Sequence, residues 1–376
     1  MGMVSALPFA VLIAMFAVSA AVIWFAGVKL ADTTAVLSIR LNLGKALGGI
    51  IILAIATNLP EIAITVSAAV SGDVGVAVGN ILGGIAIQTV VLVAMDVAMT
   101  EPVPMSYRAA SLSLVIEAVL VIAVLIVAIM ATQLPRSLIA ARLTPGTAMI
   151  GIFWVGGVWL SSRAANSLPW HESSGNAPDS QEKPKGHSRA SRESASAARS
   201  ETTRRAVLIF ICAAAATLAA GVLLERSGEA IAKSIGLSGV LFGATVLAAA
   251  TALPELSTGI TAVRMKDYQL AISDIFGGNA FLPVLFLLAV LISGKAVLPD
   301  AQASDIYLAG LGILLTCVYA AGLIFRHKRQ VLGMGIDSLI VLILYVAGTA
   351  GLFAISSAHR TETSAPVGQT IPTDKR

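Results

Sequence analysis

Charged residues are scarce in this chain, and the few that it has are unevenly spread. Lys, Arg, Asp and Glu make up 12% of the 376 residues, whereas hydrophobic residues make up 57%. A soluble domain carries about 25% charged residues, because its surface faces water. The long stretches without charge therefore exclude a water-soluble globular protein and predict a membrane protein with several spans.

Cysteine and histidine are also rare. The two cysteines, Cys212 and Cys317, lie within apolar segments, which favours packing as small hydrophobic side chains over a disulfide bond or a metal site. The four histidines fall in polar segments, which argues against a histidine metal centre. The chain has neither a Walker-type phosphate loop nor a hydrolytic constellation. We therefore expect no permanently bound cofactor, no nucleotide or nucleic-acid partner and no enzymatic activity.

Ten apolar segments reach or approach the length of about 20 residues that a helix needs to cross the hydrocarbon core. They lie near 4–27, 44–70, 74–96, 109–131, 146–161, 205–224, 237–263, 269–293, 305–325 and 335–356. The first has no basic region before it, which favours a retained span over a cleaved signal peptide. The predicted fold class is an all-α polytopic membrane protein with about ten transmembrane helices.

A polar segment at 162–205 divides the apolar chain into two halves. It is rich in Ser, Pro, Lys and Glu, so we expect a disordered linker between a first five-span half (1–161) and a second (206–356), with a polar tail at 357–376. Loops assigned to the inside hold 17 of the 25 Lys and Arg residues. The positive-inside rule then places both termini outside and the linker in the cytoplasm, in a plasma (inner) membrane.

The chain contains an internal duplication. An offset of 194 residues pairs 47–87 with 241–281, and 16 of these 41 positions are identical, including Thr, Pro, Glu and Gly residues that membrane composition does not explain. The repeats, 44–92 and 238–286, are five spans apart. Because five is odd, the second copy crosses the membrane in the opposite sense. Inverted repeats of transporters place the substrate site near the bilayer midplane, where broken helices from both halves meet.

The chemistry of the repeat predicts a cation site. Pro60 and Pro254 lack an N–H, so two backbone carbonyls lose their helical donors inside an apolar segment. Carbonyl, hydroxyl and carboxylate oxygens are the ligands of hard cations such as Ca²⁺, Mg²⁺ and Na⁺. In the alternative interpretation, the prolines only kink the helices and the acids pair with bases, but no Lys or Arg lies in the middle of a span. The predicted ligands are Ala56, Thr57 and Glu61 in the first copy and Ala250, Thr251 and Glu255 in the second.

Further polar residues in the repeats are possible ligands: Asn58, Asn80, Gln88 and Asp274. Two interpretations of Asp274 stay open, an ion ligand and an interhelical hydrogen bond without ion contact. Glu117, within the fourth span, has no acidic counterpart in the ninth. It is either a proton relay or an acid that faces a polar partner in the bundle.

The quoted motifs resemble those of a known family. TNLPE with GNILGG in the first copy, and TALPE with DIFGGN in the second, are similar to the α-repeats of the calcium:cation antiporter superfamily, which includes the sodium/calcium exchangers. The resemblance implies two inverted five-helix repeats that bind Ca²⁺ through Thr57, Glu61, Thr251 and Glu255, and alternating access by movement of spans one and six.

The chain departs from this family at several positions. Where the family has serines, this sequence has Asn58, Ala252, Gly84 and Gly278, and where it has an Asn or Asp four positions further on, this sequence has Gln88 and Leu282. The implied function is exchange of Ca²⁺, or a related divalent cation, for Na⁺ across the lipid bilayer. Because the missing oxygens belong to positions that the resemblance associates with Na⁺, H⁺ coupling is the alternative, and a cation channel is a third.

Overall fold

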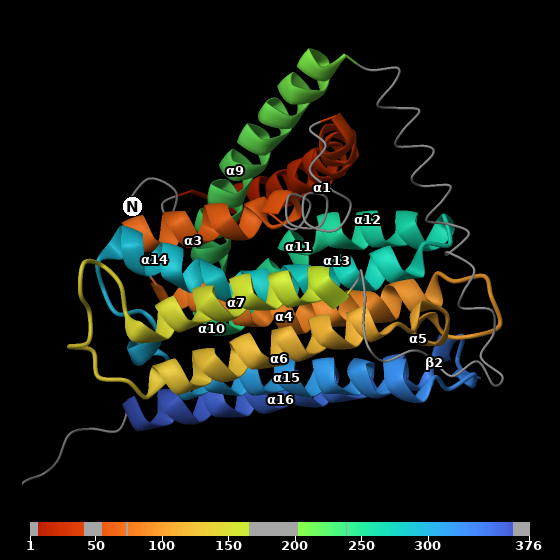
Figure 1. The fold of residues 1–376 in the computed structure, drawn as a ribbon. Helices are drawn as coiled ribbons and strands as arrows, with labels where there is room; N and C mark the ends of the chain where they lie inside the picture. Colours follow the sequence, from red (N-terminus) through yellow and green to blue (C-terminus); the bar gives the residue numbers. More distant parts are fainter. Residues whose placement is uncertain (1–6, 41–54, 73, 165–201, 238, 364–376) are drawn as a thin grey trace, which may run out of the picture.

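The computed structural model describes residues 7–40, 55–72, 74–164, 202–237 and 239–363, and within them the chain is almost entirely helical (Figure 1). The elements of the first half are α1 (Phe9–Arg40), α3 (Leu59–Ser71), α4 (Val74–Val97), α5 (Met105–Ala109), α6 (Leu112–Thr132) and α7 (Pro145–Ala164). Those of the second half are α9 (Thr203–Ser234), α10 (Gly239–Phe242), the π-helix η2 (Gly243–Leu247), α11 (Ala248–Thr251), α12 (Leu253–Arg264), α13 (Tyr268–Phe281), the 3₁₀ turn η3 (Leu282–Val284), α14 (Leu285–Ser293), the 3₁₀ turn η4 (Leu298–Asp300), α15 (Ala303–Phe325), β1 (Gln330–Val331), β2 (Met334–Gly335) and α16 (Ile336–Thr363).

Most of the long helices are apolar enough to span a membrane. Among the described residues seven helices meet this criterion, or eight when the bent pair formed by Gly243–Thr251 and Leu253–Arg264 is one span. Leu59–Ser71 and Pro145–Ser161 are shorter apolar helices. The prediction of a polytopic all-α membrane protein is confirmed, whereas a count of ten is not. The start of the second predicted span and the 165–201 part of the linker lie outside the described residues.

Several boundaries differ from those predicted. Helix α1 continues to Arg40 and α9 to Ser234, because Ala, Lys, Glu and Arg after the apolar run are good helix formers. The predicted span 269–293 is interrupted at η3, where Pro283 removes a backbone donor. Helix α16 extends to Thr363 and thus into the polar tail predicted at 357–376.

Two further features were not predicted. A two-stranded hairpin joins α15 to α16, and its turn residues Leu332 and Gly333 have φ of 55° and 79°, as a tight hairpin turn requires. Cys212 and Cys317 are free, and both are exposed on the surface of their helices. An apolar helix surface offers such positions because lipid, like a core, accepts a small hydrophobic side chain.

The two halves are related by an approximate twofold axis. Asn279 donates a hydrogen bond of 3.4 Å to the carbonyl of Ile85, which is its own counterpart at the offset of 194 residues. A twofold relation between two copies brings the residues near its axis against their own counterparts. The counterpart helices α1 and α9 pack along one another, and Figure 1 shows them crossing at one side of the bundle, away from α15 and α16.

The main core lies around α4, between the elements of both halves. Helix α4 is largely buried and packs against α3, α13, α15, α16 and the segment from α10 to α12. Gly83 permits a close backbone approach to η2, since a Cβ there would lie 2.2 Å from the Cα of Ala244. The repeat helices therefore form a tightly packed block around the predicted site.

Candidate cation site

The predicted site lies where two helices restart after a break. Asn58 precedes α3 and Ala252 precedes α12, with similar backbone angles of −86°, 14° and −79°, 3°. Pro60 and Pro254 are the second residues of the new helices, where their missing N–H is tolerated. Glu61 and Glu255 follow in the first turn, where the helix dipole favours a negative charge. At the second break the axes of the two helical segments differ by 50°.

The four principal predicted ligands face one another across the two halves. Glu61 and Glu255 are within electrostatic reach of each other, Thr251 lies beside Glu61, and Thr57 lies beside Glu255. All four side chains are at most 1% exposed. None of the four carboxylate oxygens has a hydrogen-bond partner among the described residues. The Thr251 hydroxyl donates to the carbonyl of Ala248 at 3.1 Å, so its lone pairs are left for another group.

This arrangement provides oxygen atoms and negative charge in a dry interior. Two buried carboxylates that are both ionised repel each other unless positive charge lies between them. The backbone carbonyls of Ala56 and Ala250 belong to residues that are also buried at the breaks. Among the described residues, no group of three or more His, Cys, Asp and Glu side chains gathers closely enough to hold a metal ion. Cation binding would therefore depend on hydroxyl and carbonyl oxygens as well as on the two acids.

The polar surroundings of the two glutamates are not symmetric. A Cβ on Gly278 would lie 3.2 Å from Nδ2 of Asn58 and 3.5 Å from Oε1 of Gln88. The two amides of the first repeat thus occupy the space that a serine side chain at 278 would take. At the equivalent Gly84, a Cβ would meet the Cδ1 methyl of Leu282 at 3.5 Å. One side of the site is lined by amides and the other by a hydrocarbon side chain.

The other predicted residues divide into two kinds. Gln88 and Asn80 are fully buried, and both polar atoms of each amide lack a hydrogen-bond partner among the described residues. Asp274 has a partner, because its Oδ2 accepts from the Thr258 hydroxyl at 2.9 Å across α12 and α13. Oδ1 of Asp274 has none among the described residues, and Asp274 is within electrostatic reach of Glu255. The structure contains the interhelical hydrogen bond, which leaves Oδ1 of Asp274 as a possible ligand.

The two long crossing helices touch the broken helices through glycine. A Cβ on Gly27 of α1 would lie 2.7 Å from Cβ of Pro254, and one on Gly221 of α9 would lie 2.8 Å from Cβ of Ala63 and 3.2 Å from the carbonyl oxygen of Pro60. Gly27 and Gly221 are counterparts at the offset of 194 residues. Each crossing helix therefore lies directly against the break of the opposite half, next to the site.

Three polar contacts near the site were not predicted from the sequence. Thr258 holds Asp274, Ser273 of α13 lies beside Glu117, and Ser67 of α3 donates to Oε2 of Glu225 in α9 at 3.1 Å. Their counterparts in the other repeat are mostly apolar, so a comparison of the two copies does not find them. Glu225 follows the apolar run of its span, and only the continuation of α9 to Ser234 brings it against α3.

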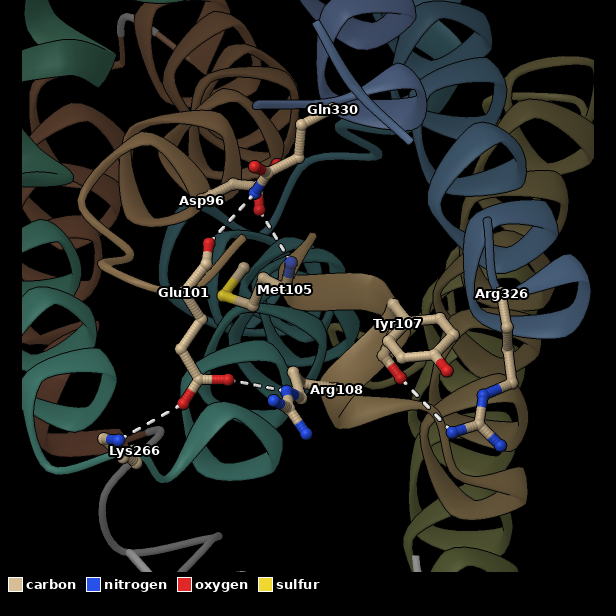
Figure 2. A network of polar contacts seen from close by, with 8 residues as sticks. All are labelled: Asp96, Glu101, Met105, Tyr107, Arg108, Lys266, Arg326 and Gln330. Atoms are coloured by element: carbon tan, nitrogen blue, oxygen red, sulfur yellow. Dashed lines mark hydrogen bonds and ion pairs between the residues drawn. The ribbon is translucent and has the colours of Figure 1, made fainter. Parts of the chain in front are cut away.

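A second polar network ties the two halves together at one end of the bundle (Figure 2). Glu101, in the loop after α4, forms ion pairs with Arg108 at 2.6 Å and with Lys266 of the second half at 3.3 Å. Burial acts to raise the pKa of Glu101, but Arg108 and Lys266 outweigh it and hold the pKa below the ordinary value of 4.5. Lys266 has φ of 62°, whereas its counterpart Gly72 has 80°, a conformation that glycine adopts without strain.

Asp96 at the end of α4 anchors the same network. Its carboxylate accepts from the backbone N–H groups of Met105 and Gly335 and from the Ser338 hydroxyl, each at 2.7 Å. Arg326 donates to the carbonyl of Tyr107 at 3.3 Å (Figure 2). Asp96 is 1% exposed. Its three donors explain why an acid is stable there.

These features define the protein as a polytopic membrane protein with two inverted repeats and a buried acidic site between them. The model of the family described as "Sodium/calcium exchanger protein" matches residues 11–160 and 205–354. The chain belongs to this family.

Individual relatives agree with this assignment. A candidate antiporter, CaxA, of Alkalimonas amylolytica is 33% identical over 105 residues, and the inner membrane protein YrbG of Escherichia coli (strain K12) is 30% identical over 109 residues. These matches cover 27% and 29% of this chain, which spans about a third, 32%, of the length of each of these curated relatives.

Two solved structures share the fold. The H⁺/Ca²⁺ exchanger CAX has a TM-score of 0.63 at 14% identity, with coverage of 93% of this chain and 89% of that one. The sodium-calcium exchanger NCX_Mj has a TM-score of 0.57 at 14% identity, with coverage of 91% and 99%. At this identity the two structures show that the chain shares their fold.

Proposed function

We propose that this protein exchanges Ca²⁺, or a related divalent cation, for a second cation at a single midplane site by alternating access. The observation that carries the proposal is the convergence of Glu61 and Glu255 from two oppositely oriented broken helices, each acid beside the threonine of the other repeat. Two acids, two hydroxyls and nearby carbonyls are the oxygen set that a hard divalent cation prefers.

The two acids also explain why exchange would be coupled. An empty site with both carboxylates ionised is electrostatically unfavourable in a dry interior. The change of access would therefore occur when the charge is compensated by a divalent cation or by the countertransported ions. The protein would then move one kind of cation only in exchange for the other, rather than leak either of them.

Helices α1 and α9 are the elements that we expect to move. They pack along each other and contact the repeat core beside Pro60 and Pro254. The contacts pass through Gly27 and Gly221, which present no side chain that would lock the helices in place. Sliding of this pair past the core would open the site to one side of the membrane and close it to the other.

Two countertransported ions are candidates. The family resemblance favours Na⁺. The asymmetry of the site favours H⁺, because the side lined by Leu282 and Gly84 offers no side-chain oxygen for a second hydrated cation, whereas a proton needs only a carboxylate. From the distribution of Lys and Arg, both termini lie outside the plasma membrane and the linker lies in the cytoplasm.

Uptake of ⁴⁵Ca²⁺ into proteoliposomes tests this function. We expect the full chain to take up Ca²⁺ against its gradient when a Na⁺ gradient or a pH gradient is imposed, and Glu61→Gln and Glu255→Gln each to lower the rate by at least about 30-fold. Glu229→Gln, which removes an acid paired with Lys233 on α9, is the matched control and is expected to leave uptake intact. Uptake at the native rate in both site variants, or downhill flux without any coupling, would contradict the proposal.

A further inference from the structure

Glu117 is a half-buried acid inside a span, and the exchange site does not use it. It lies in the second turn of α6, and its Oε2 is inaccessible to solvent and has no hydrogen-bond partner among the described residues. The counterpart of Glu117 at the offset of 194 residues is Leu311, so the acid is not part of the repeat. An ionisable side chain inside a membrane span is costly, and where it occurs it usually marks the pathway of an ion or proton.

Polar groups connect Glu117 to one end of the bundle. Ser113 precedes it by one helical turn and therefore lies on the same face of α6. The Ser113 hydroxyl is 2.9 Å from that of Ser111, which caps the helix through a 3.4 Å hydrogen bond from the N–H of Leu114. The residues just before Ser111 belong to α5, which carries Tyr107 and Arg108 of the network in Figure 2. This end of α6 thus lies at the end of the bundle where the charged groups gather.

Polar groups also lead from Glu117 toward the exchange site. Ser273 of α13 lies beside Glu117, and its hydroxyl is buried without a hydrogen-bond partner among the described residues. The next residue, Asp274, accepts from Thr258, whose hydroxyl also lies 3.1 Å from the carbonyl of Glu255. The counterparts of Ser273 and Thr258 are Gly79 and Ile64, so the other half has no such line.

In the part of the chain that the structure describes, no charged side chain is placed to compensate Glu117. Among the described residues, Ser273 is the one side chain that interacts electrostatically with it. The charged groups on the elements packed against α6 lie elsewhere: Arg163 in the last turn of α7, Asp300 at the end of η4, Asp305 in the first turn of α15 and Asp274 of α13, which is bonded to Thr258. A proton is therefore the cation available to neutralise this carboxylate.

We propose that Glu117 is a proton relay that connects the exchange site with the end of the bundle at Ser111, along Ser113 on one side and Ser273 and Thr258 on the other. The inference rests on the proposed function and deepens it, since it makes H⁺ the countertransported ion. In each transfer one O–H bond breaks and another forms, and the carboxylate of Glu117 alternates between its ionised and its protonated form. The divalent cation would use a separate route beside α1 and α9.

The test separates proton movement from Ca²⁺ movement. The full chain in proteoliposomes is assayed for ⁴⁵Ca²⁺ uptake driven by a pH gradient and for ⁴⁵Ca²⁺/Ca²⁺ counterflow at equal pH, which needs no proton. We expect Glu117→Gln to lower pH-driven uptake on the order of 100-fold and to leave counterflow within about twofold of the native rate. Glu117→Asp, which keeps a carboxylate, is expected to restore most of the pH-driven uptake.

Three results would overturn the relay. The first is native pH-driven uptake in Glu117→Gln. The second is loss of counterflow together with pH-driven uptake in that variant, since this would assign a purely structural role to Glu117. The third is that a Na⁺ gradient drives Ca²⁺ uptake by the unaltered protein and a pH gradient does not. This result would contradict the relay but not the proposed antiport. If the unaltered protein shows neither Ca²⁺ uptake nor counterflow, the proposed function itself is contradicted.

Discussion

At the scale of single residues, the site combines two acids that the repeat preserves with amides that it does not. Glu61 and Glu255 occupy equivalent places in α3 and α12. Asn58 and Gln88 both lie at Gly278, whereas Ala252 and Leu282 are their counterparts in the other half. Burying an amide without a partner costs about 1–3 kcal/mol, so Gln88 is better explained as a group that meets the transported cation than as packing.

Gly278 and Gly84 offer a matched pair of substitutions. Gly278→Ala places a methyl group 3.2 Å from Nδ2 of Asn58 and 3.5 Å from Oε1 of Gln88, so the amides must shift. Overpacking of this kind costs about 1–3 kcal/mol, and we expect the apparent KM for Ca²⁺ to rise about tenfold. Initial rates of ⁴⁵Ca²⁺ uptake at varied Ca²⁺ concentration measure the effect.

Gly84→Ala is the control for this prediction. Its new methyl group meets a methyl of Leu282 at 3.5 Å, which is an ordinary contact. We expect the KM for Ca²⁺ to stay near the native value. Equal effects of the two substitutions would show that the amide side of the site has no special part in binding Ca²⁺.

Glu101 predicts how the free energy of unfolding depends on pH. Because Arg108 and Lys266 hold its pKa in the folded protein below the ordinary value of 4.5, its ion pairs stabilise the protein above that pH and are lost as the pH falls through the lowered pKa. We expect the Tm in detergent to fall below pH 4.5, and more steeply for the native chain than for Glu101→Gln. Parallel curves for the two proteins would contradict this role.

At the scale of elements, the breaks in the helices and the crossing pair α1 and α9 set the geometry of the site. The prolines made the breaks predictable. The lengths of α1 and α9 were not, because hydropathy marks where lipid ends and not where a helix ends. The interruption at Pro283 was missed because an apolar run of this length conceals a single 3₁₀ turn.

The contact of α9 with α3 provides a test of movement. Gly221→Ala inserts a methyl group 2.8 Å from Cβ of Ala63 and 3.2 Å from the carbonyl of Pro60. If α9 slides past this point, the maximal uptake rate should fall about tenfold while Ca²⁺ binding at equilibrium changes little. Rates of ⁴⁵Ca²⁺ uptake and Ca²⁺-dependent shifts of Tm measure the two quantities.

Gly156→Ala in α7 is the matched control, because a Cβ there would meet nothing within 4 Å. It should leave both the rate and the binding unchanged. A native rate in Gly221→Ala would mean that the contact of α9 with α3 does not change during transport.

At the scale of the whole molecule, the inverted repeat is the feature that the sequence predicted best. Five spans between the copies sufficed to infer opposite orientations, and the hydrogen bond between Asn279 and Ile85 joins a residue to its own counterpart, as a twofold relation requires near its axis. The identity of the four central residues was also predictable, since they recur in both copies. Contacts that occur once, such as those of Ser67 with Glu225 and of Ser273 with Glu117, depend on how helices cross and leave no repeated pattern.

The orientation in the membrane is open to direct measurement. Ser137 and His327 are exposed at opposite ends of the bundle, near the start and the end of α15, as the Arg136–Asp300 ion pair and the position of Arg326 show. In a chain with Cys212→Ser and Cys317→Ser, we expect an impermeant maleimide to label Ser137→Cys in intact cells and His327→Cys after lysis alone. The reverse pattern would invert the assigned topology.

Gly27 and Gly221 face Pro254 and Pro60 with nothing larger than a hydrogen atom. Such a contact holds the two helices close together, and no side chain projects from the glycine to interlock with the opposite helix. Replacing either glycine with alanine would place a methyl group 2.7 Å from Cβ of Pro254 or 2.8 Å from Cβ of Ala63 and would push the helices apart. If α1 and α9 slide during transport, as we propose, this movement depends on a clearance smaller than a methyl group at two equivalent points.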